Sequence, residues 1–253
     1  MGSRVVRISA LQALGNKLSV FLNIYPSGIY NKSASPDKIF SYGMTTEADC
    51  MGKGYDKIYS TLLPKLAELD WAESASRLGG TRSEDGVRLS FLGRDYIITN
   101  DGVEPEDGEP VNVNIRSILI YYVTSSGSGD FSHDFALLNR LTGMIDGQKN
   151  LANSIMNDPL IREFADDYGR FARAMESLGG VEIPTSSSGK HVWQLRPLPK
   201  ILSQIVFYEA DEEFPADIQI MFDRSAPRFL DFECLAFMTG AMIRAIIDSE
   251  GRP

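Results

Sequence analysis

The chain has 253 residues, of which 43% are hydrophobic and 23% charged, a composition typical of a globular protein long enough to bury a sizeable core. Its 34 acidic residues outnumber its 25 basic ones, and the net charge of -9 argues against nucleic acid and anionic membranes as partners. Because Cys50 and Cys234 are the only cysteines, neither a disulfide framework nor a four-thiolate cluster is expected, and a reducing cytoplasm is the simplest location.

The first 50 residues differ from the rest of the chain. A mildly apolar start is interrupted by Asn16 and Lys17 and leads into a stretch rich in Ser, Gly and Lys without clean periodicity. No apolar run reaches the roughly 18 residues that a membrane span needs, and no signal-peptide cleavage site follows the apolar start. Residues 1–50 are therefore expected to form a loosely ordered arm or to follow a wrongly assigned start. Residues 51–253 are expected to form one domain.

Order begins near Tyr55, where helical spacing of apolar residues predicts a helix that reaches Leu69 and is kinked at Pro64. Asp70, followed by Glu73 three residues later, predicts the start of a second helix. Gly79 is typical of the left-handed residue at which such a helix ends.

Extended structure and a third helix come next. Alternating apolar residues over 87–99 predict two strands, with a bend at Gly93. Turn signals at 100–102 and 107–108 follow. Pro110 then suits the first turn of a helix over 111–123, which should be buried because apolar positions surround most of its circumference.

The second half of the chain begins after a flexible connector at 125–130. Asp158-Pro159 predicts another helix start, with a break at Gly169 and an end at Gly179-Gly180. A strand is expected at 191–196. A further helix from about Asp231 to Asp248 should bury Cys234 in the core.

The most distinctive stretch is Ile201 to Asp223, which predicts a strand, an acidic corner and a second strand. Three carboxylates stand side by side at the corner, those of Asp211, Glu212 and Glu213. Pro215 restricts the residue before it to an extended conformation. The ring of Phe214 is therefore expected to anchor the corner in the core.

The sequence around two predicted helix ends is weakly similar. At a constant offset of 100, Trp71, Ala75, Leu78, Gly79 and Gly80 match Phe171, Met175, Leu178, Gly179 and Gly180. Two similar α-then-β halves, 54–124 and 157–248, would explain the match, and chance is the alternative. The fold class is predicted to be α+β, with a mainly antiparallel sheet and helices packed on one face.

Five short segments resemble one known family. They are LSFLGRDY (89–96), DGEP (107–110), DEEFP (211–215), MFD (221–223) and LDFE (230–233). They resemble the domain of unknown function 3786 family, found mainly in anaerobic bacteria and archaea, over roughly residues 54–248. DEEFP is the most specific of them. The family has no established activity, but the resemblance implies an association of some members with iron–sulfur modules or corrinoid-dependent one-carbon metabolism.

The chain departs from that family pattern at two places. Tyr208-Glu209-Ala210 stands where the family more often has Trp and Gly, and Phe232 stands where a capping Thr is usual, which leaves Asp231 as the expected cap. Two distant cysteines cannot hold an iron–sulfur cluster alone. Any such cofactor would therefore belong to a protein partner.

Candidate site residues come mainly from the acidic corner and its surroundings. They are Asp211, Glu213, Asp223 and Glu233. Oxygen-rich corners suit Mg²⁺ or Ca²⁺, and crowded carboxylates can form an acid–base pair. Strand alternation lets at most two of the three consecutive acids converge. The alternative is a solvated turn in which one acid caps a neighbouring backbone.

The remaining candidates are isolated residues. Arg94 could bind an anion, or it could form an ion pair with its own chain. His133 and His191, the only histidines, lie in neither a zinc-protease motif nor a nucleophile elbow and are interpreted as structural. No catalytic residue, cofactor or resident metal is assigned.

Two functions follow as hypotheses. The favoured one is a non-catalytic binding or accessory protein of anaerobic metabolism that docks a cofactor-bearing partner. The alternative is a metal-assisted or acid–base enzyme centred on Asp211, Glu212 and Glu213. The sequence specifies neither a ligand nor an oligomeric state.

Overall fold

The computed structural model describes residues 56–141 and 158–249, all within a unit that begins at Gly52. The predicted arm over 1–50 lies outside the described residues. Within the described ranges, no helix combines the length and the apolar character needed to cross a membrane.

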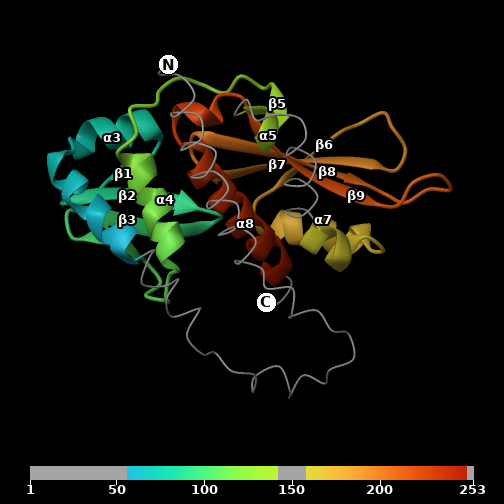
Figure 1. Cartoon of the computed structure of the whole chain (residues 1–253), viewed down its shortest axis with the longest axis horizontal. Coiled ribbons are helices and arrows are strands. Elements are labelled where there is room, and N and C mark those ends of the chain that lie inside the picture. The colour runs from blue at the N-terminus through green and yellow to red at the C-terminus, as the bar shows by residue number, and fades with distance from the viewer. Residues whose placement is uncertain (1–55, 142–157, 250–253) are drawn as a thin grey trace, which may run out of the picture. The chain divides into compact units, whose positions relative to one another are not determined.

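A four-stranded antiparallel sheet forms the first half of this unit (Figure 1). Its strands, in spatial order, are β1 (Thr81–Arg82), β2 (Gly86–Phe91), β3 (Arg94–Thr99) and β4 (Gly102–Pro105). The helical segments beside it are residues 56–62, the 3-10 helix η2 (Leu63–Glu68), α3 (Trp71–Leu78) and α4 (Val113–Val123).

Alternating burial gives the first sheet one apolar face. In β2 the side chains of Val87, Leu89 and Phe91 are buried, while Arg88 and Ser90 are exposed. The register places buried residues of β3 directly opposite buried residues of β2, so that one face is continuously apolar. Helices α3 and α4 both contact this sheet.

Local capping signals set the helix ends. Asp70 Oδ1 accepts hydrogen bonds from the N–H groups of Ala72 and Glu73, both at 3.0 Å. Gly79 ends α3 with a φ of +75°. The predicted start and stop are therefore confirmed. The prediction for Pro110 is wrong, because Asn112 caps α4 two residues later through a hydrogen bond from the N–H of Asn114.

A five-stranded antiparallel sheet forms the second half. Its strands are β5 (Phe135–Leu137), β9 (Asp217–Asp223), β8 (Ile201–Tyr208), β7 (Lys190–Leu198) and β6 (Val181–Ile183), in that spatial order. The helices of this half are α5 (Leu138–Leu141), residues 158–164, α7 (Tyr168–Ser177), the 3-10 helix η3 (Ala226–Arg228) and α8 (Phe232–Asp248).

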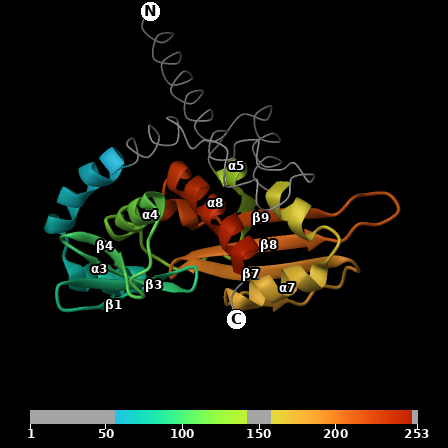
Figure 2. The same ribbon diagram turned by 90° about the horizontal axis from the view of Figure 1, so that it is seen from below.

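One face of this second sheet receives α7 and α8 (Figure 2). The ring centroids of Phe171 in α7 and Phe207 in β8 are 5.1 Å apart. Ser203 in β8 lies 3.8 Å, Oγ to Sδ, from Met242 in α8. The predicted α+β class with antiparallel sheet is confirmed. The helix break lies before Asp167, which caps α7, and not at Gly169 as predicted.

The two halves share one order of elements. Each has a helix, a four-stranded meander and a second helix: α3-β1-β2-β3-β4-α4 and α7-β6-β7-β8-β9-α8. Equivalent elements touch, because β2 contacts β7 and α4 contacts α8. Contacts between equivalent elements are what a twofold relation produces. The shared order agrees with the sequence similarity at an offset of 100 residues, and superposition of the two halves stays a prediction.

A buried tyrosine joins the halves. Tyr122 in α4 donates a hydrogen bond to the carbonyl of Leu78 (2.8 Å) and accepts one from the N–H of Lys200 (2.9 Å). Burial raises the pKa of Tyr122. Its hydroxyl is thus a neutral link between α3 and the β7–β8 turn.

Candidate functional site

The acidic corner between β8 and β9 is an ordered turn. Asp211 Oδ1 accepts hydrogen bonds from the N–H groups of Glu213 (2.8 Å) and Phe214 (2.7 Å). The N–H of Asp211 in turn donates to the carbonyl of Phe214 at 2.9 Å. An aspartate that accepts from the backbone two and three residues later forms an Asx turn. One carboxylate oxygen of Asp211 therefore holds its own loop together.

Phe214 does not anchor this turn in the core, and that prediction is wrong. The residue is 67% exposed, whereas Ala216 and Ile218 after it are buried. The Asx turn closes at Phe214, and the chain rejoins the sheet only at Asp217, opposite Tyr208. Figures 1 and 2 show the loop between β8 and β9 projecting past the ends of the strands. Phe214 is consequently displayed at the tip.

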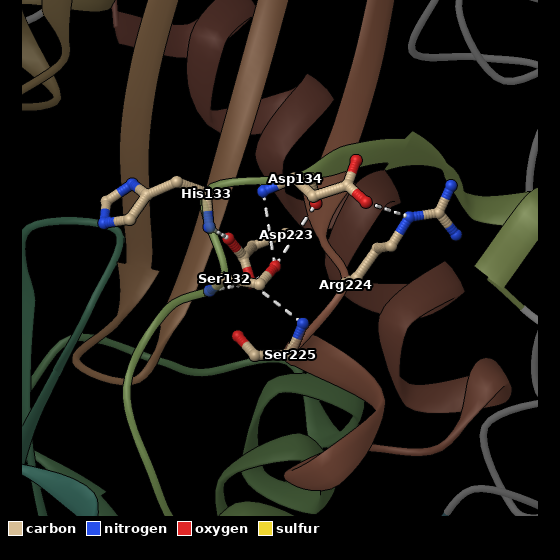
Figure 3. A network of polar contacts seen from close by, with 6 residues as sticks. All are labelled: Ser132, His133, Asp134, Asp223, Arg224 and Ser225. Atoms are coloured by element: carbon tan, nitrogen blue, oxygen red, sulfur yellow. Dashed lines mark hydrogen bonds and ion pairs between the residues drawn. The ribbon is translucent and has the colours of Figure 1, made fainter.

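Asp223 lies at the opposite end of β9, about 20 Å from Asp217 by the rise of an extended strand. Its side chain is fully buried. It accepts hydrogen bonds from the N–H of Ser132 (3.0 Å), the hydroxyl of Ser132 (2.9 Å), the N–H of His133 (2.6 Å) and the N–H of Ser225 (2.8 Å), as Figure 3 shows. The structure therefore does not bring Asp211 and Asp223 together.

The protonation of Asp223 follows from these donors. Burial alone would raise the pKa of its carboxyl, but the hydrogen bonds from Ser225 and Ser132 outweigh burial and lower the pKa to about 2. The carboxylate is thus ionised and surrounded by backbone and hydroxyl donors. This environment suits an anchor for residues 132–134 better than a group that exchanges protons.

Ser132, His133 and Asp223 do not form a catalytic triad, although the three residue types meet here. It is the backbone N–H of His133 that contacts Asp223, and Figure 3 shows the imidazole pointing away from the carboxylate. His133 has a left-handed φ of +56°. Next to it, Arg224 pairs with Asp134 at 2.7 Å. The network fastens the segment before β5 to the end of β9.

Glu233 lies in the first turn of α8, where a negative charge complements the helix dipole. The cap of that helix is Asp231, which accepts a hydrogen bond from the N–H of Cys234 at 2.9 Å, as predicted. Cys234 is buried, and burial raises the pKa of its thiol. In the described part of the chain, no three His, Cys, Asp or Glu side chains are placed to share a metal ion.

Arg94 is engaged with its own chain. Its Nε and Nη2 bond the two carboxylate oxygens of Asp107 at 2.7 and 2.6 Å, and Nη2 also donates to the carbonyl of Glu109 at 2.7 Å. This fork raises the pKa of Arg94 and lowers that of Asp107. The guanidinium also lies over the ring of Tyr96. Arg94 thereby ties β3 to the loop after β4.

A cluster around His191 was missed by the sequence interpretation. The imidazole Nδ1 lies 3.2 Å from Glu182 Oε1, and Nε2 lies 2.8 Å from Glu209 Oε1. The ring stacks on Tyr168 with centroids 3.5 Å apart. Burial and the hydrogen bond to Glu182 raise the pKa of Tyr168 to about 12. The cluster fixes the base of the β8–β9 loop to β7 and α7.

Strand periodicity could have placed His191 on the same face as Trp193, whose indole N–H donates to the Tyr168 hydroxyl at 3.3 Å. The two glutamates could not have been found in that way. They come from β6 and from the residue after β8, so their position beside His191 depends on the register between three strands.

These observations define a class of protein: two antiparallel meanders, each flanked by helices, with an ordered acidic hairpin loop that displays an aromatic ring. The chain belongs to the family described as Domain of unknown function (DUF3786), which it matches over residues 70–245. The resemblance found in the sequence is confirmed at the level of the family. No curated protein and no solved structure matches the chain.

Proposed function

We propose that this protein is a non-catalytic binding or accessory protein that docks a partner protein through the β8–β9 tip, defined as residues 209–216. The observation that carries the proposal is the exposure of Phe214 on a turn that is otherwise ordered. The family resemblance supports the finer proposal that the partner bears a cofactor of anaerobic, corrinoid-dependent or one-carbon metabolism.

The tip has the physical character of a binding element. The Asx turn at Asp211 and the bond from the N–H of Glu209 to the carbonyl of Gly189 (2.8 Å) fix its backbone. An aromatic side chain held in a rigid loop loses little conformational entropy on binding. Fully burying a Phe ring contributes about 1.5–3 kcal/mol, and most of this ring is still in contact with water.

The charge around Phe214 specifies the partner surface. Four exposed acidic residues share the tip with the ring, namely Glu209, Asp211, Glu212 and Glu213. An apolar pocket with a basic rim is complementary to this arrangement, because the ring fills the pocket while the acids face opposite charges. The partner is therefore proposed to carry such a pocket.

The alternative, an enzyme centred on the acidic corner, has less support. Asp211 uses one oxygen in the Asx turn, and Glu212 and Glu213 are exposed to water. Acid–base catalysis depends on a shifted pKa and hence on burial or close charges. Thermal melts with Mg²⁺, Ca²⁺ or Mn²⁺ test this alternative directly, since a bound cation would raise the melting temperature.

The docking proposal is tested with Phe214→Ala in the full chain. Affinity capture from the native organism identifies a partner, whose purified form is then titrated against each variant. We expect Phe214→Ala to raise the dissociation constant at least tenfold, which is a loss of about 1.4 kcal/mol of binding free energy. The free energy of unfolding should change by less than about 0.5 kcal/mol.

Val181→Ala is the matched control, because Val181 is also an exposed apolar residue, at 61%, but lies on edge strand β6. It should bind within about twofold of the parent protein. Equal binding by Phe214→Ala and the parent would remove the tip from the interface. A partner whose absorption spectrum shows no cofactor would overturn the finer proposal alone.

A further inference from the structure

A second surface lies at the other end of the five-stranded sheet. Four basic residues gather there from separate elements: Arg196 in β7, Lys200 in the β7–β8 turn, Arg224 after β9 and Arg228 in η3. The tip at the opposite end is acidic, and the whole chain carries a net charge of -9. The sheet is therefore electrically polar from one end to the other.

The segment between α4 and β5, residues 125–134, extends the predicted connector and is called the connector from here on. Three of these cations lie against three consecutive residues of it. Arg228 Nη1 lies 3.1 Å from the position of a Cβ on Gly129, Lys200 Nζ lies 3.6 Å from Asp130, and the Arg196 guanidinium lies 5.1 Å from the ring centroid of Phe131. The Cα atoms of residues 129 and 131 can be no more than roughly 7 Å apart. The three cations thus line the same short stretch of the connector.

Carboxylates neutralise this positive charge only in part. Arg224 is paired with Asp134, and Lys200 contacts Asp130, whose side chain is 98% exposed and therefore a weak partner. Within the described residues, no carboxylate pairs with Arg196 or Arg228. Neighbouring like charges repel one another, and a bound anion would remove that repulsion.

The backbone of the connector adds donors to the same surface. The N–H groups of residues 126–131 donate to no acceptor in the described chain, although Gly127 is buried. The carbonyls of Ser125 and Gly127 are held by Arg77 at 2.6 and 2.8 Å. A Cβ at residue 127 would lie 2.3 Å from the carbonyl oxygen of Arg228. The connector is therefore closely packed against η3 and preorganised.

Unpaired N–H groups beside arginine side chains are the usual components of a phosphate site, because the guanidinium fork matches two phosphate oxygens. We propose that the connector face, defined as residues 127–131 with Arg196, Lys200 and Arg228, binds the phosphate group of a small molecule. This site is independent of the β8–β9 tip and of any partner bound there.

The test is isothermal titration of the full chain with pyrophosphate and with inorganic phosphate, in a phosphate-free buffer at constant ionic strength. We expect saturable binding, with pyrophosphate the tighter of the two. Arg196→Gln and Arg228→Gln should each weaken it about tenfold, the equivalent of one lost charge-assisted hydrogen bond. Arg88→Gln is the matched control, since Arg88 is a half-exposed arginine on β2.

Arg88→Gln should bind within twofold of the parent protein. Circular dichroism melts verify that each variant is folded, and both Arg196 and Arg228 are exposed. Absence of saturable binding would overturn the proposal, as would equal weakening in all three variants, which indicates nonspecific attraction. Tighter binding of a tetraglutamate peptide than of pyrophosphate would overturn it too, because the surface would then select acidic chain segments.

Discussion

Asp211 and Asp223 belong to the same hairpin and differ in almost everything else. At the tip, Asp211 is exposed and accepts from N–H groups two and three residues away. At the base, Asp223 is fully buried and accepts from Ser132, 91 residues away. The first carboxylate shapes a local turn, whereas the second fastens one segment of the chain to another. Burial and the origin of the donors separate the two roles.

The largest expected effect is that of Asp223→Asn. An amide has one acceptor oxygen, and its NH₂ group would face the N–H donors of Ser132, His133 or Ser225. Losing charged acceptors and leaving buried donors unpaired should lower the free energy of unfolding by about 3 kcal/mol. Urea denaturation measures this loss.

The control for that measurement is Asp211→Asn, since asparagine also forms Asx turns. It should change the free energy of unfolding by less than about 0.5 kcal/mol. Equal losses in the two variants would show that burial does not separate the two aspartates.

Lowering the pH tests whether Asp223 stabilises the protein through its charge. The pKa of Asp223 is about 2 in the folded protein, against about 3.9 in an unfolded chain. Between these values the unfolded chain binds the proton and the folded protein does not, so falling pH favours unfolding. The contribution of Asp223, about 2–3 kcal/mol, should be complete above pH ~4 and lost as the pH falls towards ~2.

The measurement is the free energy of unfolding of the parent protein and of Asp223→Asn at several pH values. The difference between the two should shrink steadily as the pH falls from ~4 to ~2. A difference that is independent of pH would show that Asp223 contributes through packing and not through its charge.

The contrast between the two aspartates also shows which features the sequence could predict. The caps at Asp70 and Asp231 and the stop at Gly79 depend on neighbours within four residues, and all three were predicted. Strands β2, β3, β7, β8 and β9 were predicted for the same reason, since alternation and turn residues are local. The short strands β1, β4 and β6 were not predicted.

Features that depend on distant segments were not predicted. Ser132 and His133, which donate to Asp223 from 90 or more residues away, lie in a stretch for which the sequence predicts no element. The glutamates beside His191 come from β6 and from the residue after β8. The apolar character of Phe214 and the proline after it predict a buried ring, but they do not reveal the Asx turn. In the structure the Asx turn holds Phe214 in the exposed loop.

The smallest expected effect concerns the tip itself. Asp211→Ala removes the acceptor for the N–H groups of Glu213 and Phe214, both of which water can reach. Losing a cap of this kind costs about 1 kcal/mol or less, because solvent replaces the lost bonds. Amide hydrogen exchange should show the effect more clearly than a melt, as faster exchange at Phe214 in Asp211→Ala but not in Asp211→Asn. Unchanged exchange in both variants would mean that the strands, and not the Asx turn, hold Phe214 in position, and an aromatic anchor would then survive any change at Asp211.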